Sequence, residues 1–561
     1  MPNYGRSGRC LTCKRRRVKC DEARPACSPC RRLGLNCGGY NKNYAFKDEN
    51  FRFTAQGLRK SVNEQNALVQ HSTGVGEPSR SLLTGADVAI PFFLLNYASM
   101  GRSLAVGRGF YETLIPVYTS QCHNSPLSLA ISAVAAGIYS FWRHEDAAQE
   151  ESHTAPYCQA VVSLRSALDH PDERAKPATA LAVLVLHLYE SLHAVYNARP
   201  ARPVHHQGAL SLLPVAALDG LDGVIGTHVK AFVLHTEISS AVRQKRSMHP
   251  NAYSYATSPH SSSLVPGSFS STLDSIGALV AELQADYVHQ LPHLHSSGTL
   301  LEQQCRAWIA QAEQINDLLQ AWARDVPDDW RPVRLTSVQD FSLSIAAYQS
   351  ACEIYPSCLI ATFWNLWRFH RLLLLQMTAS ATQHIPVLRD EPSVEECESA
   401  GSIQELVDGI CYSVPFCLGN RAGQSCLSDF ANPDISFPSY HSLAPGDSRH
   451  RDWKSTPLSK DEHHRHMVAY GAWHLLSPLS NLLTLVSDDH GGRFVARCLR
   501  PGQLQWIREQ FLRTCTLLRL PAARAFSEQK GRISSPLPSA DDAAETLAKQ
   551  VRKGARFMSG P

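Results

Sequence analysis

Apolar residues recur at intervals of three and four over most of the chain, from about residue 91 to residue 526. This spacing places them on one face of an α-helix, whereas the alternation expected of a half-buried strand is scarce. Helices too apolar to stand alone must bury those faces against one another. The pattern predicts a mostly α protein, with an all-helical body around one extended core. The predicted helices are 127–142, 157–168, 178–195, 229–242, 273–288, 300–323, 359–377, 403–418, 469–486 and 504–518.

Polar stretches interrupt or flank this pattern. Residues 46–90 are predicted to be a flexible linker, and residues 527–561 a C-terminal tail that is either a short helix or disordered. Within the body, the acidic stretch 385–402 and the Ser-, Pro-, Asp- and His-rich stretch 420–466 are predicted to be loops. The second loop is interpreted as a disordered insertion in preference to an activation segment, and either loop offers a surface for co-regulators.

Charge is divided unevenly along the chain. The formal net charge is +4, but residues 1–37 hold ten Lys/Arg against two acidic residues, a formal +8. The remaining residues hold 44 basic against 48 acidic side chains. The composition therefore predicts a basic head that meets a polyanion, on a larger and nearly neutral body. The most apolar run, 180–189, is too short to span a bilayer and predicts a buried helix, with no membrane partner.

Six of the 17 cysteines lie near the N-terminus with the spacing C-x2-C-x6-C-x6-C-x2-C-x6-C. They are Cys10, Cys13, Cys20, Cys27, Cys30 and Cys37. The unit C-x2-C-x6-C occurs twice, 17 residues apart. Two tetrahedral zinc ions require eight thiolate positions, which six cysteines fill only if two of them bridge both ions. Cys10 and Cys27, the first cysteines of the two repeat units, occupy equivalent positions and are therefore the predicted bridging ligands.

A disulfide framework and an iron–sulfur cluster fit this spacing less well than zinc. Disulfide frameworks belong to secreted chains, and residues 1–9 contain no apolar signal-peptide core. Iron–sulfur ligands follow different spacings. The remaining eleven cysteines show no metal-ligand spacing and are predicted to be reduced, buried thiols.

Each half of the repeat predicts a short helix that starts inside its C-x2-C. Thr12 is the expected N-cap of the first helix and Ser28 of the second, where Pro29 suits the first helical position and Gly34 ends the turn. Five of the six residues that follow Cys13 are cationic, against only two in the corresponding stretch of the second half. The first helix is therefore the predicted contact surface for a polyanion.

These residues resemble the fungal six-cysteine binuclear zinc cluster at the N-terminus of many fungal transcription factors. The resemblance includes the basic stretch CKRRRVKCD, which ends at Asp21, and Pro25 in the loop between the halves, where the family often has a cis proline. It implies two zinc ions, and a first helix that enters the major groove of double-stranded DNA and reads a CGG triplet. It also implies a nuclear protein that regulates transcription by RNA polymerase II.

Carried over residue by residue, the base-reading positions of that family fall on Arg16 and Arg17. Arginine suits this role because its planar fork meets O6 and N7 of one guanine together. The other cations are expected to contact phosphates, which positions the protein without specifying a sequence. They are Lys14, Arg15, Lys19, Arg24, Arg31 and Arg32.

Several predicted helices resemble the fungal-specific transcription factor regulatory domain. The similar stretches are 206–213 (HQGALSLL), 322–330, 355–371 with its WN-x-W-R core, 410–419 (ICYSVPFCLG) and 506–526. The resemblance implies an α-helical region that tunes activity and receives ligands or partners. The predicted organisation is a zinc cluster at 1–45, the linker, a regulatory domain at 91–526 and the tail.

Enzyme signatures are missing from the sequence. It contains no G-x-S-x-G, no G-x-x-x-x-G-K-[ST] and no H-E-x-x-H, so the protein is not predicted to be an enzyme. Histidines gather at 289–295 and at 463–466 without supporting ligands, and both groups are interpreted as solvated. Two function classes remain: a sequence-specific transcription regulator, and a zinc-module scaffold or co-regulator with mainly non-specific DNA contact. A preference for CGG of several kcal/mol separates them.

Dimerisation is expected to involve the body. One short helix reads about three base pairs, which is too few to select a site in a genome. Apolar residues at Leu58, Val62 and Val69 cover less than two heptads, so no coiled coil is predicted in the linker. A homodimer formed through the helical body is the expected state.

Overall fold

The protein is described from a computed structural model, in which the chain divides into two compact units, Met1–Leu82 and Leu83–Pro561. The described residues are 10–21, 23, 26–38, 85–99, 107–143, 151–197, 199–214, 223–257, 268–294, 298–336, 340–386, 394–443, 447, 449, 458–488, 492–520 and 540–554. Arg24, Pro25 and the apolar positions considered for a coiled coil lie outside these residues.

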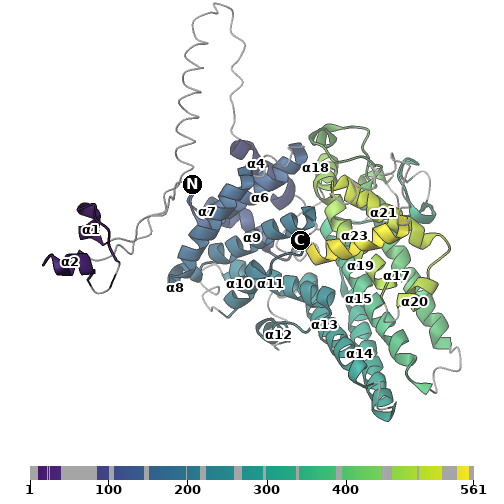
Figure 1. The fold of residues 1–561 in the computed structure, drawn as a ribbon. Coiled ribbons are helices and arrows are strands. Elements are labelled where there is room, and N and C mark those ends of the chain that lie inside the picture. Colours follow the sequence, from purple (N-terminus) through teal and green to yellow (C-terminus); the bar gives the residue numbers. More distant parts are fainter. Residues whose placement is uncertain are drawn as a thin grey trace, which may run out of the picture. The chain divides into compact units, whose positions relative to one another are not determined.

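The described part of the first unit contains the short helices α1 (Leu11–Arg15) and α2 (Ser28–Arg32), shown in purple in Figure 1. Its buried core consists of cysteine side chains. A core made of cysteine sulfurs buries too little apolar surface for the described residues to fold unaided, so metal coordination must supply the missing stabilisation.

The second unit is built almost entirely of helices (Figure 1). Its first part contains α4 (Gly85–Phe93), the π-helix η1 (Leu94–Ser99), α5 (Phe110–Thr119), α6 (Pro126–Arg143), α7 (Glu151–Leu168), α8 (Pro171–Arg174), α9 (Pro177–Tyr196), α10 (Val204–Leu212), α11 (Gly223–Gln244) and α12 (Pro250–Thr257). Its middle part contains α13 (Phe269–Leu294), α14 (Gly298–Asp325), η5 (Asp328–Trp330), β1 (Val333–Leu335), η6 (Tyr348–Ser350), β2 (Cys352–Ile354), α15 (Cys358–Thr382) and α17 (Val394–Leu418). Its last part contains η7 (Leu427–Ala431), η8 (Tyr440–Ser442), α18 (Lys460–His466), the π-helix η9 (Met467–Gly471), α19 (Ala472–Val486), α20 (Gly492–Arg497), α21 (Gln503–Leu517) and α23 (Ala540–Gly554).

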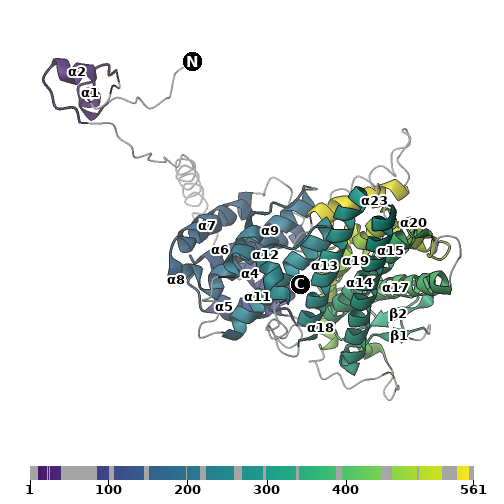
Figure 2. The same cartoon turned by 90° about the horizontal axis from the view of Figure 1, so that it is seen from below.

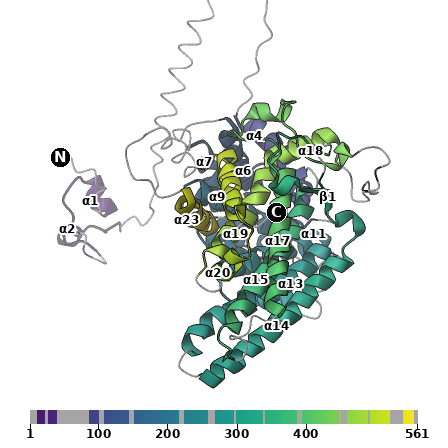
Figure 3. The ribbon, with the colours of Figure 1, turned by 90° about the vertical axis from the view of Figure 1, so that its right-hand side faces the viewer.

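A continuous hydrophobic core runs through this unit, from Ala89 in α4 to Val551 in α23. The long helices α13, α14, α15 and α17 pack side by side, as Figures 1 and 3 both show. Helix α9 is long and apolar enough to cross a membrane by length and composition, but 78% of its most apolar stretch is buried inside the body. The prediction of a buried helix over 180–189 is therefore confirmed, as is the mostly helical fold.

A small sheet departs from the predicted all-helical body. Strands β1 and β2 pair antiparallel, with Val333 opposite Ile354, and lie beside α17 (Figure 2). Buried Glu353 of β2 accepts hydrogen bonds from Arg368 of α15 at 2.6 Å and from Arg334 of β1 at 2.9 Å. Arg368, the arginine of the WN-x-W-R stretch, thus links the sheet to α15. Strands of three residues carry too little alternation to be recognised from sequence.

Several predicted loop boundaries are wrong in extent. The predicted linker reaches residue 90, but α4 begins at Gly85. The loop predicted over 385–402 ends at α17, which begins at Val394. In the stretch 420–466, the described residues include η7, η8 and α18. The ring of Phe430 there lies 4.9 Å from that of Trp142, so this part packs onto the core and is not a disordered insertion. The tail also forms α23, whose buried residues Leu547 and Val551 join the core.

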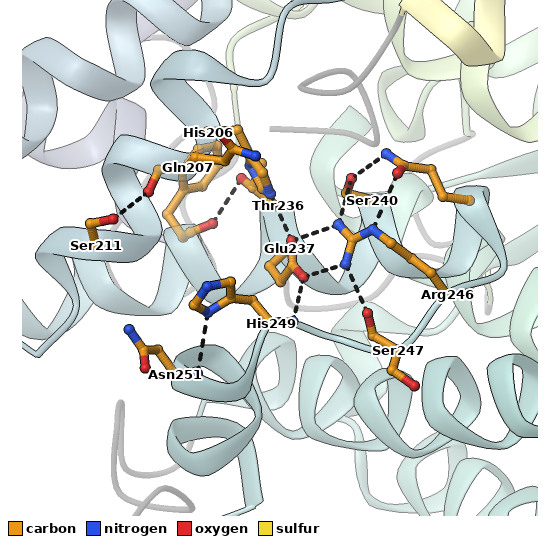
Figure 4. Close-up of polar contacts among 12 residues, drawn as sticks. His206, Gln207, Ser211, Thr236, Glu237, Ser240, Arg246, Ser247, His249 and Asn251 are labelled. Carbon is orange, nitrogen blue, oxygen red and sulfur yellow. Dashed lines mark hydrogen bonds and ion pairs between the residues drawn. The ribbon is translucent and has the colours of Figure 1, made fainter.

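A buried acid links three helices in the first half of the body (Figure 4). Glu237 of α11 is inaccessible to solvent and accepts hydrogen bonds from His206 of α10 at 2.6 Å and from Arg246 at 2.7 and 3.0 Å. It also accepts the backbone N–H of His249, just before α12, at 2.8 Å. Desolvation alone would raise the pKa of Glu237, but these donors lower it to about 2. The carboxylate therefore stays ionised and fixes α10, α11 and the start of α12 together.

Candidate metal centre and nucleic-acid interface

Six cysteine sulfurs converge between α1 and α2. Cys10, Cys13, Cys27 and Cys30 are fully buried, while Cys20 and Cys37 are partly exposed. Within each of two sets of four cysteines, the sulfur atoms all lie within 4.8 Å of one another. One set is Cys10, Cys13, Cys20 and Cys27, and the other is Cys10, Cys27, Cys30 and Cys37. The structure thus brings together all six predicted ligands, with Cys10 and Cys27 common to both sets.

The sulfur spacing suits tetrahedral zinc. Within the two sets, Cys27 Sγ lies 3.6 Å from both Cys10 Sγ and Cys13 Sγ, and Cys30 Sγ lies 3.8 Å from Cys10 Sγ. Four thiolates around one zinc ion at about 2.3 Å are separated by roughly 3.8 Å. Desolvation raises the pKa of the Cys13 thiol to about 12, so zinc must displace a proton when this sulfur coordinates it. The donor set fits two zinc ions.

Backbone hydrogen bonds repeat with the same 17-residue offset as the cysteines. Lys14 N–H donates to Cys10 O at 2.9 Å, and Arg31 N–H donates to Cys27 O at 3.0 Å. After each helix, the chain closes through a bond to the second cysteine of the half, from Val18 to Cys13 and from Leu35 to Cys30. The two halves therefore share one backbone conformation as well as one cysteine spacing.

The helix caps differ from those predicted. Cys10, not Thr12, is the N-cap of α1, and its sulfur accepts the N–H of Cys13 at 3.3 Å. Thr12 instead links the residues after α2 to α1, because its hydroxyl donates to Asn36 O and accepts the N–H of Gly38, both at 2.9 Å. Cys27, not Ser28, occupies the N-cap position of α2.

Asp21 has a structural role that the sequence did not predict. Its carboxylate oxygens each lie 3.1 Å from the backbone nitrogen of Ser28, at the start of α2. Hydrogen bonding to Ser28 lowers the pKa of Asp21, so a negative charge caps the positive end of that helix. The sequence clue was an acid placed one residue after Cys20, but nothing in the spacing indicated its partner.

Arg17 and Gly34 occupy equivalent positions in the two halves, and both have a left-handed backbone. The φ angle is +54° at Arg17 and +58° at Gly34. Glycine adopts this conformation without steric cost, as predicted for the end of the second helix, whereas an L side chain there costs about 1–2 kcal/mol. The first half therefore keeps an arginine where the backbone favours glycine.

The predicted DNA-contacting cations of the described residues are all exposed. Lys14 and Arg15 end α1, Arg16 is its C-cap, and Arg17 and Lys19 follow it. Arg31 and Arg32 end α2. The first half thus presents five cations in one short segment and the second presents two, while Arg24 falls outside the described residues. This surface has the charge that binding to a phosphate backbone requires.

Comparisons with known proteins agree with this geometry. Residues 9–44 match the Fungal Zn(2)-Cys(6) binuclear cluster domain. The chain is 22% identical to Transcription factor dbaG of Emericella nidulans over 358 residues, which are 63% of this chain and 79% of that protein. It is 33% identical over 82 residues to the Aspercryptin biosynthesis cluster-specific transcription regulator atnN of the same fungus, covering 14% of this chain and 13% of the relative.

A third relative matches within a short segment only. It is the C6 finger domain transcription factor hasF of Aspergillus fumigatus, 64% identical over 28 residues, which are 5% of this chain and 4% of the relative. No solved structure shows significant similarity to the chain. Residues 9–44 are a fungal Zn(2)-Cys(6) binuclear cluster domain that binds two zinc ions, and the protein that carries it is a DNA-binding transcription regulator.

Proposed function

We propose that this protein acts in the nucleus, where α1 and the residues just after it read a CGG-type triplet in the major groove and direct transcription by RNA polymerase II. The conformation of Arg17 is the observation that carries this proposal. Residues held in a strained backbone conformation mark sites where a side chain is retained for function. Arg17 is such a residue, at the end of an exposed basic helix.

The proposed zinc ligands are the six cysteines, with Cys10 and Cys27 bridging both ions. The two overlapping sets of sulfur atoms support this assignment. Two tetrahedral sites without a shared ligand would need about eight thiolates, and sites sharing one ligand about seven. The N-terminal unit contains six cysteines, which complete both sites only when two of them are shared.

The proposed base contacts are Arg16 and Arg17, with phosphate contacts from the remaining cations. Arg16 and Arg17 close the C-terminal end of α1, so they project beyond the helix that the family places in the groove. The phosphate-contacting residues are Lys14, Arg15, Lys19, Arg24, Arg31 and Arg32.

The body is proposed to be the regulatory region, extending to residue 526 and beyond it into α23. Its support is the similarity to dbaG, which extends over far more of the chain than the zinc cluster, together with the helical fold around one core. The proposed partners of this region are transcriptional co-regulators.

Replacing Arg17 by glycine separates DNA reading from folding. We expect the Arg17→Gly variant to keep both zinc ions and to fold at least as stably, because glycine relieves the left-handed strain. Its preference for CGG over a scrambled duplex should fall by about 1–3 kcal/mol. The matched change, Gly34→Arg, should cost about 1 kcal/mol of stability and leave the preferred sequence unchanged. Binding titrations and thermal unfolding of both variants decide this, and an unchanged preference in Arg17→Gly would contradict the assignment.

Arg31→Ala is expected to weaken binding to all sequences alike. A phosphate contact carries no sequence information, so its loss should lower the salt slope of log K by about one without altering the preferred triplet. Titrations on CGG and scrambled duplexes at several salt concentrations measure both quantities. A changed sequence preference would place α2, and not α1, on the bases.

The same salt titrations distinguish the regulator from a scaffold or co-regulator with mainly non-specific contact. A regulator prefers its site by several kcal/mol at every salt concentration, whereas a scaffold shows only the salt-dependent backbone contribution. The exposed Arg17 favours the first of these.

The active form is proposed to be a homodimer that associates through the body. We expect residues 1–90 to sediment as a monomer that binds one CGG weakly, and the full chain to sediment as a dimer that binds paired triplets more tightly. A dimeric 1–90 fragment would instead place the contact in the linker, and a monomeric full chain with full site affinity would remove the dimer.

A further inference from the structure

A second group of metal-ligating side chains lies inside the body. Cys358 is the first residue of α15, His466 is the last residue of α18, and His474 lies in α19. One ligand atom from each lies within 4.8 Å of the other two, and all three residues are buried. The prediction that the histidines at 463–466 are solvated is wrong for His463 and His466, because α18 packs both into the core.

The π-helix η9 explains how two histidines eight residues apart reach one site. In a regular α-helix, residues eight apart are rotated by about 80° from one another around the axis. A π turn accommodates one extra residue, so His466 and His474 take positions close to those of residues seven apart, about 20° from alignment. Gly471 fixes this turn against α17, since a Cβ there would lie 2.0 Å from the carbonyl oxygen of Cys417. Such π turns occur frequently at functional sites.

The hydrogen bonds of Thr362 determine the tautomer of His474. The Thr362 hydroxyl donates to Cys358 O at 3.0 Å, so its oxygen accepts from His474 Nδ1–H at 2.6 Å. Nε2 of His474 therefore carries the lone pair that a metal ion requires. A hydrogen bond from the second ring nitrogen is also what orients metal-binding histidines in known sites.

Cys358 supplies a buried thiol at the first position of a long helix. It begins α15, a helix of 25 residues whose N-cap is Ser357. A second sulfur is close by, because Met467 Sδ lies 3.2 Å from Cys358 Sγ. Met467 is fully buried, as is Cys358.

Ligand type and charge together select the ion. A thiolate, a thioether and imidazoles are soft or borderline donors that suit Cu(I), whereas zinc is bound by Cys, His and carboxylate but not by a thioether. The ligand set has no carboxylate among the described residues. A monovalent ion with one thiolate and neutral ligands leaves the buried site without net charge, whereas a divalent ion leaves an uncompensated positive charge in the core. Arg421 lies nearby, where its guanidinium donates to Val468 O in η9. Its charge is paired with Asp429, so this carboxylate does not offset the positive charge that a divalent ion would leave in the core.

We propose that Cys358, His466 and His474 bind one Cu(I) ion, with Met467 as a fourth, weaker ligand. The Cys358 thiol loses its proton to solvent as the ion binds. A cavity of about 30 Å³ lined in part by Thr362 and His474 borders the histidine side of the site. The ligands come from α15 and from the α18–α19 segment, which are more than 100 residues apart in sequence. Bound Cu(I) therefore cross-links two parts of the proposed regulatory region. The proposal does not depend on which DNA sequence the head reads.

The test measures Cu(I) bound to the full-length, zinc-loaded protein. Cu(I) is delivered without oxygen from its bicinchoninate complex to the wild type and to Cys358→Ser, His466→Gln and His474→Gln. Cys305→Ser is the matched control, since it removes a buried thiol of α14 that belongs to no ligand group within the described part of the chain. All variants keep the same zinc cluster, so a difference in copper uptake reports the body.

We expect the wild type and Cys305→Ser to bind one Cu(I) more than each of the three ligand variants. The unfolding midpoint of the body should rise with Cu(I) in the first two proteins only, because an ion that binds the folded state stabilises it. If Cys358→Ser does not fold, copper uptake by His466→Gln and His474→Gln is compared with that of the wild type and Cys305→Ser. Equal copper uptake by all proteins would overturn the site. A zinc ion held by these residues, and not displaced by Cu(I), would overturn the choice of metal.

Discussion

Replacing Cys27 by serine is expected to remove both zinc ions and unfold the head. Cys27 Sγ is fully buried and belongs to both four-sulfur sets, so its loss deprives each ion of a ligand. The cysteines form the buried core of the unit's described residues, and its folding free energy comes from metal coordination. Zinc content measured by mass spectrometry after dialysis should fall from two ions per chain to none, and specific DNA binding should disappear with it.

The control for this experiment is Cys515→Ser, which removes a buried thiol of the body and should retain both ions. Cys37→Ser provides a second comparison, since Cys37 belongs to one set only and the other ion keeps all four of its sulfurs. A Cys27→Ser protein that holds one zinc ion tightly would show that Cys27 does not bridge.

Replacing Glu237 by glutamine is expected to cost the body about 2–3 kcal/mol of unfolding free energy at neutral pH. The change keeps the shape of the side chain but removes the charge that pairs with the partly exposed Arg246 and with the buried His206. Removing one partner of a fully buried ion pair costs about 3–5 kcal/mol, and the cost is smaller here because solvent partly compensates the charge that remains on Arg246. Denaturant unfolding followed by tryptophan fluorescence measures the difference.

The pH dependence of stability gives an independent check on Glu237. Its pKa is about 2 in the folded protein, against an ordinary value near 4.5. A carboxyl group with a lowered pKa contributes stability above its unfolded pKa and loses it as the pH falls toward the folded value. The wild type should therefore lose up to about 3 kcal/mol from this group between about pH 5 and pH 2. The glutamine variant should lack that part of the slope.

Glu302→Gln is the matched surface control. Glu302 pairs with Arg306 at 2.8 Å on the exposed face of α14, where such pairs contribute well under about 1 kcal/mol. An equal effect of the two substitutions would mean that the buried pair around Glu237 contributes no more than a solvated one.

Periodicity predicted the long helices because their apolar faces are determined by local spacing. The predicted helix 178–195, for example, ends within two residues of α9 on each side. The cysteine spacing likewise predicted which sulfurs would gather, since coordination number limits how six ligands serve two ions. Helix periodicity and cysteine spacing can both be read from the sequence without knowledge of the tertiary structure.

Features that depend on distant partners were missed. The sequence around Asp21 does not indicate that its carboxylate caps α2. Thr12 has the residue type and position of an N-cap, but its hydroxyl hydrogen-bonds to residues 36 and 38 instead. His466 lies in a polar stretch but is buried, because the π turn after it rotates it toward Cys358, over 100 residues earlier. Local composition carries no signal for such contacts.

Selection of bound sequences from a pool of random duplexes tests the central claim most directly. The full-length, zinc-loaded protein is incubated with the pool at physiological salt, and the bound fraction is sequenced over several rounds beside the Arg17→Gly variant. Reading through α1 predicts strong enrichment of CGG triplets by the wild type and a relaxed guanine preference in the variant. Unselective retention of all sequences by the wild type, or an enriched motif that Arg17→Gly leaves unchanged, would contradict it.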